Sequence, residues 1–323
     1  MTSMPIATSF QNKPSNLQAF QFASCPTYII GFGDNCKIGT VELRMAERLA
    51  LIFGAALFRN ALMETCDAFA ESSKEGFALL DSHSGCAWQA RDFAELVALV
   101  DFYLDKRFRL NIPEGLASVH CCALELNGSA VVFVGESGAG KTTFSLSAMA
   151  SGIPLLGDEY GLVDFVNCRY AQISSPVCLK AGSRECLGEF ATRIPSGYFA
   201  KSVRGLTYEL ISMTDLHNAM RFEGSAKISG FAPTMCGACG PSLPLKAVIT
   251  LSRGSEAASL RPSLVQQWPR AYLPSFDWES SRSNLFKGLL GMGSKGVCYL
   301  ELSYMNALDV VEMLKRNLFH WTM

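Results

Sequence analysis

One glycine-rich stretch of the chain has the residue types and the spacing of a phosphate-binding loop. Residues 135–142 read GESGAGKT and match the pattern G-x-x-x-x-G-K-[ST]. In such a loop the glycines let consecutive backbone N–H groups curl around phosphate oxygens. Lys141 would place its ammonium group on the β- and γ-phosphates, and the Thr142 hydroxyl would bind Mg²⁺. The pattern therefore predicts a site for ATP with Mg²⁺.

The elements beside the loop agree with this prediction. Residues 131–134 form an apolar, β-branched run that predicts a strand, and residues 142–150 contain good helix formers followed by Ser-Gly, a helix stop. A helix that begins at the loop adds its partial positive charge to an anion site. The alternative is a glycine-rich turn that binds nothing.

A pair of carboxylates follows shortly after the loop. Asp158 and Glu159 come after Leu155 and Leu156 in what reads as a short buried strand, one helix beyond Lys141. An Asn-Gly turn at residues 127–128 predicts a hairpin before the loop strand. A kinase needs carboxylates near the γ-phosphate, both as a base for an acceptor hydroxyl and as a metal ligand.

At these residues the chain resembles the catalytic domain of the HPr kinase/phosphorylase family, whose fold is related to phosphoenolpyruvate carboxykinases. The resemblance rests on His120, the loop, the Asp158-Glu159 pair and the SSPVCLK stretch that ends at Lys180, and it covers residues 115–180 best. That family normally has Asp-Asp in place of Asp-Glu, and its Glu-Ile-Arg-Gly-x-Gly signature is absent here. The chain is more similar to HPr-kinase-related kinases of natural-product pathways, including those that phosphorylate a serine of a lasso-type precursor peptide.

The resemblance implies an α/β fold: a P-loop kinase core with a mixed sheet flanked by helices, plus a small N-terminal α/β lobe. It also implies an ATP-dependent kinase that acts on a hydroxyl, such as a serine of a peptide or protein. In this reading Asp158 is the catalytic base, Glu159 and Thr142 hold Mg²⁺, and His120 assists at the phosphate or the acceptor. A small-molecule kinase and a nucleotide-binding regulator or ATPase remain alternatives.

The residues expected to contact the nucleotide include one from a later strand. Residues 245–251 predict a buried strand, and ligands of α/β sheets gather at the carboxyl ends of strands. Arg253 follows this strand and is a candidate phosphate ligand, although a capping or surface arginine is the alternative. The full predicted nucleotide set is Gly135, Glu136, Ser137, Gly138, Ala139, Gly140, Lys141, Thr142, Thr143 and Arg253.

Composition limits the class of protein. The 323 residues are 49% hydrophobic, which is enough for a buried core. They carry 28 Lys+Arg against 29 Asp+Glu, so the chain lacks the excess of positive charge that is typical of nucleic-acid-binding proteins. The N-terminus lacks the pattern of a secretory signal and the longest apolar run is short for a membrane span, which predicts a cytoplasmic protein without a membrane partner.

The 12 cysteines lack a disulfide framework, and we expect reduced thiols. The C-x-x-C at residues 236–239 predicts a plain loop in preference to zinc or redox chemistry. A homo-oligomer is left open.

The predicted order of parts is a mobile N-terminus at residues 1–16, an α/β lobe at residues 17–114 and an ATP-binding domain at residues 115–323. In the lobe we expect a helix over residues 41–58, a strand over 77–80, a helix starting after Asp92, and a solvated His83 in a turn. Residues 170–180 should extend the main sheet and present Lys180 to phosphate or to solvent. Residues 185–233 are a candidate lid or a surface elaboration.

The last part of the chain predicts three further elements. We expect a helix over residues 285–290, a strand over 297–302 and a final helix that Asn306 caps. Acidic residues early in the final helix and basic residues late in it agree with the helix dipole.

Overall fold

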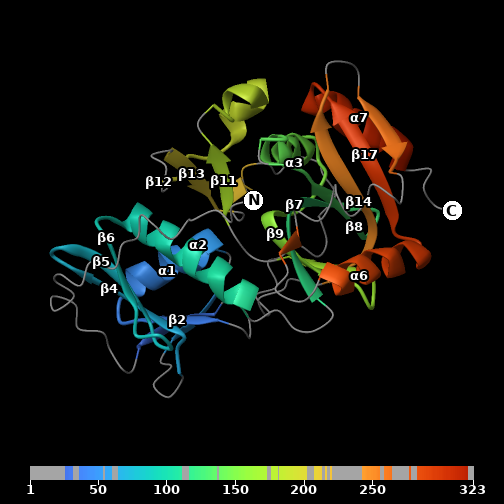
Figure 1. Cartoon of the computed structure of the whole chain (residues 1–323). Helices are drawn as coiled ribbons and strands as arrows, with labels where there is room; N and C mark the ends of the chain where they lie inside the picture. Colours follow the sequence, from blue (N-terminus) through green and yellow to red (C-terminus); the bar gives the residue numbers. More distant parts are fainter. Residues whose placement is uncertain are drawn as a thin grey trace.

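The computed structural model shows an α/β protein with mixed sheets (Figure 1). It describes residues 26–31, 36–53, 55–59, 65–110, 116–136, 138–172, 176–180, 182–201, 207–212, 215–216, 219, 242–254, 258–263, 276–277 and 282–318. The predicted mobile N-terminus at residues 1–16 and the C-x-x-C at residues 236–239 lie outside these ranges.

The N-terminal lobe is a six-stranded sheet with two helices packed on it. The strand order is β3-β1-β2-β4-β5-β6. The elements are β1 (Tyr28–Gly31), β2 (Lys37–Thr40), α1 (Leu43–Phe53), β3 (Ala56–Arg59), β4 (Ala68–Ser73), β5 (Gly76–Asp81), β6 (Ala87–Ala90) and α2 (Phe93–Leu110). The expected strand over residues 77–80 is confirmed by β5.

Two helix predictions in this lobe have different outcomes. The start of α2 is confirmed, because the Asp92 carboxylate accepts a hydrogen bond from the Glu95 backbone N–H at 2.8 Å. The helix predicted over residues 41–58 is wrong in its last part, because α1 ends at Phe53 and residues 56–59 form β3, which pairs with β1. A short apolar run fits either element, and the free edge of β1 decided the outcome.

The second part of the chain is built on an eight-stranded mixed sheet. Its strand order is β10-β9-β7-β8-β14-β17-β15, and β16 pairs with β7. The strands are β7 (Leu116–Leu126), β8 (Ser129–Val134), β9 (Leu155–Asp164), β10 (Arg169–Gln172), β14 (Leu243–Arg253), β15 (Ser259–Pro262), β16 (Phe276–Asp277) and β17 (Cys298–Tyr304). The predicted Asn-Gly hairpin joins β7 to β8, with both turn residues at positive φ.

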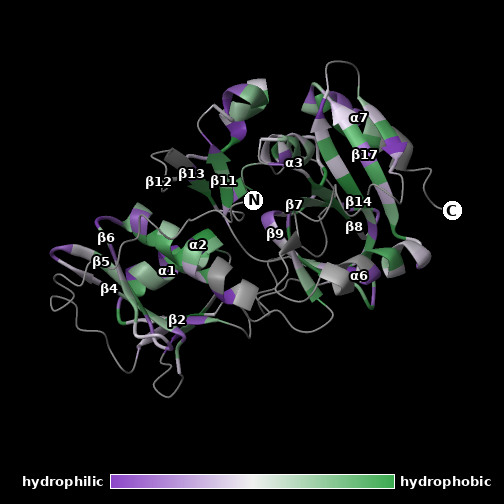
Figure 2. Ribbon diagram, in the orientation of Figure 1, coloured by the Kyte–Doolittle hydropathy of each residue, from purple (hydrophilic) through white to green (hydrophobic). Residues whose placement is uncertain are grey.

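Helices cover both faces of this sheet and make a three-layer arrangement (Figure 1). One face packs on α3 (Lys141–Ala150) and α7 (Ala307–Leu318), and the other packs on α6 (Arg282–Ser294). Mostly hydrophobic residues line the strands between these layers (Figure 2). Asn306 caps α7 as predicted, because its side-chain oxygen accepts the Leu308 N–H at 3.0 Å.

The three central strands are parallel, which brings their carboxyl ends to one edge. β14 pairs in parallel with β8 on one side and with β17 on the other. Thr250 of β14 lies opposite Val134, the last residue of β8, and Arg253 lies opposite Tyr304, the last residue of β17. The segments that follow β8, β14 and β17 therefore meet at one edge of the sheet, where ligands of α/β proteins gather.

The prediction that residues 170–180 extend this sheet is only half right. β10 pairs with β9 and also with the start of β14, whereas β11 (Val177–Lys180) belongs to a separate sheet of order β11-β13-β12. The other two strands of that sheet are β12 (Tyr198–Lys201) and β13 (Thr207–Ile211), and a short helix, η3 (Glu185–Arg193), precedes them. Periodicity alone does not say which sheet a strand joins.

The two parts of the chain share a hydrophobic core. Leu162 of β9 and Leu210 of β13 pack into the cluster that α1 and α2 form with the first sheet. Ser212 also donates a hydrogen bond to the Leu51 carbonyl of α1 at 2.9 Å. The nine cysteines in the described ranges form no disulfide with one another. In the same ranges no helix has the length and apolar character needed to cross a membrane.

The position of Gly161 gives a test of packing in the main sheet. A Cβ on Gly161 would lie 2.3 Å from the Tyr170 ring, which is buried between β9 and β14. Gly161→Ala should therefore destabilise the protein by about 1–3 kcal/mol through overpacking, measured by urea unfolding. Gly291→Ala is the matched control, since a Cβ there meets nothing within 4 Å and alanine favours the α6 helix. Equal stability of the two variants would contradict this account.

Candidate functional site

The phosphate-loop segment joins β8 to α3, as the sequence predicts. β8 ends at Val134 and α3 begins at Lys141, with Gly140 as the residue before the helix. Gly140 has φ of +92° and ψ of 19°, a left-handed conformation that favours glycine. Of the predicted loop residues, Ser137 lies outside the described ranges. The loop thus stands at the edge of the sheet where the ends of β14 and β17 also lie.

Lys141 is buried and turns back into the loop. Its ammonium group donates to the carbonyl oxygens of Gly135 at 2.8 Å and Glu136 at 3.4 Å. A buried ammonium group needs hydrogen-bond acceptors, and here the loop itself supplies them. The charge of Lys141 is therefore held inside the loop, where phosphate oxygens could replace the two carbonyls.

Asp158 lies directly below the start of α3. Its carboxylate accepts hydrogen bonds from the hydroxyls of Thr142 at 2.8 Å and Ser145 at 3.3 Å, and the residue is only 2% exposed. Burial, followed by the negative charge of Glu159, raises the pKa of Asp158 to about 7, although the two hydroxyls and Lys141 act in the opposite direction. This carboxylate can therefore change its protonation state near neutral pH.

Glu159 leaves the regular pleat of β9. In the register of β7 and β9 it lies opposite Cys121, whose side chain packs on the α6 face of the sheet. Regular alternation would bury Glu159 on that face. Its φ of +84°, a left-handed value rare for a residue with a side chain, instead brings its carboxylate to His120 on the α3 face, at 3.1 Å.

The His120–Glu159 pair is half-buried, with 37% and 30% of the side chains exposed. Burial opposes the charge of Glu159, but the hydrogen bond and charge of His120, with Lys141 and Lys180, hold the pKa of Glu159 below its usual value. The His120 ring also lies against Tyr160, with 5.3 Å between ring centroids. Two adjacent carboxylates thus have opposite pKa shifts, because burial and the charge of Glu159 raise the pKa of Asp158, whereas His120 lowers the pKa of Glu159.

Arg253 and Tyr304 complete the edge of the loop. A Cβ on Gly140 would lie 3.6 Å from two guanidinium nitrogens of Arg253 and 2.4 Å from the Tyr304 hydroxyl. The Tyr304 hydroxyl donates to the Ala139 carbonyl at 2.8 Å. Arg253 was predicted as a phosphate ligand, and its guanidinium group lies beside the loop. Tyr304 was not predicted.

The structure groups the predicted site residues differently from the sequence-based roles. Thr142 contacts Asp158 and not Glu159, whereas His120 contacts Glu159. Ser145 was missed, although its position three residues after Thr142 places both hydroxyls on one face of α3. Among the residues that the structure describes, no contact of the Thr143 side chain supports its predicted role; its backbone carbonyl accepts a hydrogen bond from the Ser147 hydroxyl.

The oxygen atoms at the base of the loop fit Mg²⁺. The Thr142 hydroxyl and the Asp158 carboxylate are hard oxygen ligands 2.8 Å apart. Mg²⁺ bound with a nucleotide takes one or two protein ligands, the phosphates and water. In the described ranges no group of three or more His, Cys, Asp or Glu residues forms a protein-only metal site.

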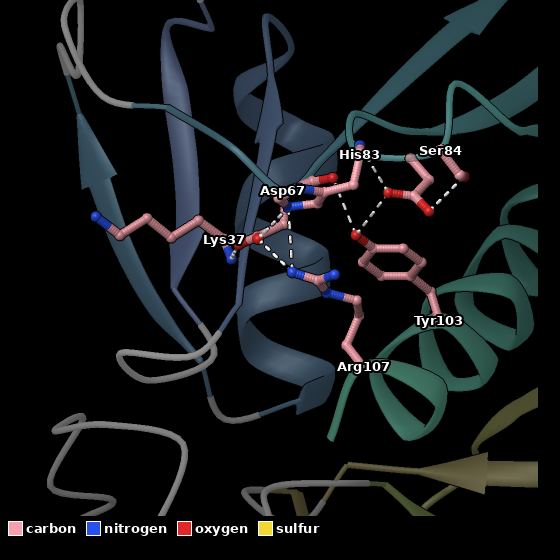
Figure 3. Close-up of polar contacts among 7 residues, drawn as sticks. Lys37, Asp67, His83, Ser84, Tyr103 and Arg107 are labelled. Atoms are coloured by element: carbon pink, nitrogen blue, oxygen red, sulfur yellow. Dashed lines mark hydrogen bonds and ion pairs between the residues drawn. The ribbon is translucent and has the colours of Figure 1, made fainter. Parts of the chain in front are cut away.

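A second polar cluster lies in the N-terminal lobe (Figure 3). The Asp67 carboxylate accepts hydrogen bonds from Arg107, from His83 and from the Lys37 backbone N–H, each at 2.8 Å. The Tyr103 hydroxyl donates to the Asp67 carbonyl at 2.9 Å. His83 was expected to be a solvated loop residue, and it is exposed but paired with Asp67. These bonds join α2 to the first sheet, and both carboxylate oxygens already have protein donors.

The raised pKa of Asp158 predicts a pH dependence of stability. Between its unfolded pKa near 3.9 and its folded pKa of about 7, the folded state binds more protons, so Asp158 lowers stability as pH rises through this window. The stability of wild type relative to Asp158→Asn should therefore be greatest below about pH 4, fall between about pH 4 and pH 7 and then level off. Urea unfolding without nucleotide or metal measures this difference, and parallel stability curves for the two proteins would contradict it.

The chain was also compared with known proteins. No protein-family model matches it, and no curated protein matches it.

Proposed function

We propose that this chain is an ATP-dependent kinase that transfers the γ-phosphoryl group to a hydroxyl. The observation that carries the proposal is the hydrogen bond between the Thr142 hydroxyl at the start of α3 and the buried Asp158 carboxylate of β9. It joins a phosphate-loop sequence to a carboxylate at the point where a nucleotide-bound metal is held in P-loop enzymes. The left-handed Gly140 and the buried Lys141 support the same reading.

We assign the metal side of the site to Thr142 and Asp158. They would hold Mg²⁺, which neutralises charge on the β- and γ-phosphates when it is bound. Lys141 would exchange the Gly135 and Glu136 carbonyls for phosphate oxygens, and Arg253 would approach from the end of β14. These cations would stabilise negative charge on the transferred group.

We assign the acceptor side to Glu159 and His120. Glu159 is half-exposed and favours its charged form, whereas Asp158 is almost fully buried beneath Thr142. A general base must reach the acceptor proton, which favours Glu159. In the proposed step the acceptor oxygen bonds to the γ-phosphorus, the bond to the β–γ bridging oxygen breaks, and the proton passes to Glu159. This allocation reverses the roles that the sequence suggested for the two carboxylates.

The acceptor is proposed as a hydroxyl, with a serine of a peptide or protein as the first candidate from the family resemblance. A small-molecule alcohol is the alternative. β11 lies beside β9, and the positive charge of Lys180 at the end of β11 acts on Glu159. The compartment follows the same proposal and is the cytoplasm, where ATP is abundant.

Lys141→Ala tests the central claim. Removal of the ammonium group should abolish transfer of label from γ-labelled ATP to a pool of serine-containing peptides, with the melting temperature reported alongside. Lys295→Ala is the matched control, because Lys295 also donates to a backbone carbonyl, that of Val166 at 2.7 Å, but lies on the surface. Near-wild-type transfer by Lys141→Ala would refute the proposal. Release of inorganic phosphate alone by wild type would favour the ATPase alternative.

A second test separates the carboxylates. Asp158→Asn should raise the Mg²⁺ concentration needed for half-maximal activity and recover partly at high Mg²⁺, because mass action refills a weakened metal site. Glu159→Gln should lower kcat by about 10²–10⁴-fold at every Mg²⁺ concentration, because metal cannot replace a base. Metal rescue of Glu159→Gln but not of Asp158→Asn would restore the roles suggested by the sequence.

A further inference from the structure

Tyr304 contacts the phosphate loop from β17, which is separated from the loop strand β8 by β14. It is the last residue of β17, and its hydroxyl donates to the Ala139 carbonyl at 2.8 Å, across 165 positions of sequence. Tyr304 is 3% exposed, and its ring lies 6.3 Å from the ring of Phe144 on α3, measured between centroids. The parallel register of β17 with β14 places Tyr304 opposite Arg253, at the end of the sheet where the loop lies.

The hydroxyl acts as a neutral donor. Burial is the main cause that raises the pKa of Tyr304 to about 12. Its partner is a carbonyl oxygen, which only accepts, so the phenol proton points at Ala139. The bond is therefore present across the whole physiological pH range.

This bond sets the direction of a backbone N–H group. The peptide unit between Ala139 and Gly140 is planar and trans, so its carbonyl and its N–H point in opposite directions. When Tyr304 holds the carbonyl, the Gly140 N–H is aimed away from Tyr304. Gly140 has the left-handed conformation, with φ of +92°, and successive N–H groups in a turn that contains such a residue can form a concave anion site.

We propose that Tyr304 is a positioning residue that presets the Ala139–Gly140 peptide for the phosphates of the nucleotide. The proposal rests on the function proposed above and adds a residue to that site. Tyr304 also confines position 140 to glycine, because a Cβ there would lie 2.4 Å from its hydroxyl. The loop is thus organised before the ligand arrives, which lowers the entropy cost of binding.

Tyr304→Phe removes the hydroxyl and keeps the ring. Without the bond the peptide can rotate, so the Kd of the Mg²⁺–ATP complex, measured by isothermal titration calorimetry, should rise by about 2–10-fold, the usual effect of one hydrogen bond. KM for ATP should rise by a similar factor while kcat changes less. The amide resonance of Gly140 should also shift between the two nucleotide-free proteins.

Tyr299→Phe is the matched control. Tyr299 lies on the same strand, is equally buried and donates to the Leu289 carbonyl at 2.7 Å, but contacts α6 on the opposite face of the sheet. It should lose stability without a change in Kd. The inference is overturned if Tyr304→Phe binds Mg²⁺–ATP like wild type, or if both variants lose affinity equally. If wild type does not bind Mg²⁺–ATP, the proposed function fails together with the inference. Failure of the inference alone is distinguishable, because wild type then still binds Mg²⁺–ATP.

Discussion

The site depends on a buried carboxylate that two hydroxyls of one helix satisfy. Asp158 is 2% exposed, and a carboxylate in that position is costly unless donors reach it. Thr142 and Ser145 are those donors, and both are present only because α3 begins directly after Gly140. The loop, the helix and β9 therefore hold one another in place. A change in any one of them would weaken the hydrogen bonds that satisfy this buried carboxylate.

The position of the Glu159 carboxylate depends on a local departure from regular strand geometry. A residue in the left-handed region with a side chain costs about 1–3 kcal/mol and persists where the surroundings demand it. At Glu159 this conformation moves a carboxylate from the α6 face of the sheet to His120. Two neighbouring acids consequently sit in different environments, with the pKa of Asp158 raised and that of Glu159 lowered. Groups whose pKa values are separated in this way suit different tasks in one reaction.

The parallel arrangement of β8, β14 and β17 brings further residues to the loop, on the side away from β9. It brings Arg253 and Tyr304 to the loop, more than 100 positions away in sequence, while β7 and β9 bring His120 and the two carboxylates. Under the proposed function, metal and acceptor chemistry lie on the β9 side and loop organisation lies on the β17 side. The N-terminal lobe is joined to this framework by a core that includes Leu162 and Leu210.

By itself the sequence determined the features that local signals encode: the strand, glycine-rich loop and helix at residues 131–150, the Asn-Gly hairpin, and the caps at Asp92 and Asn306. Apolar periodicity could not end α1 at Phe53 or assign β11 to its own sheet, because both outcomes depend on which strand edge is available for pairing. Tertiary structure alone decided which carboxylate meets Thr142, which face Glu159 takes and that Tyr304 holds the loop. These contacts join distant segments and depend on strand register and on the φ angle of Glu159. Neither the register nor this angle is encoded in a local sequence pattern.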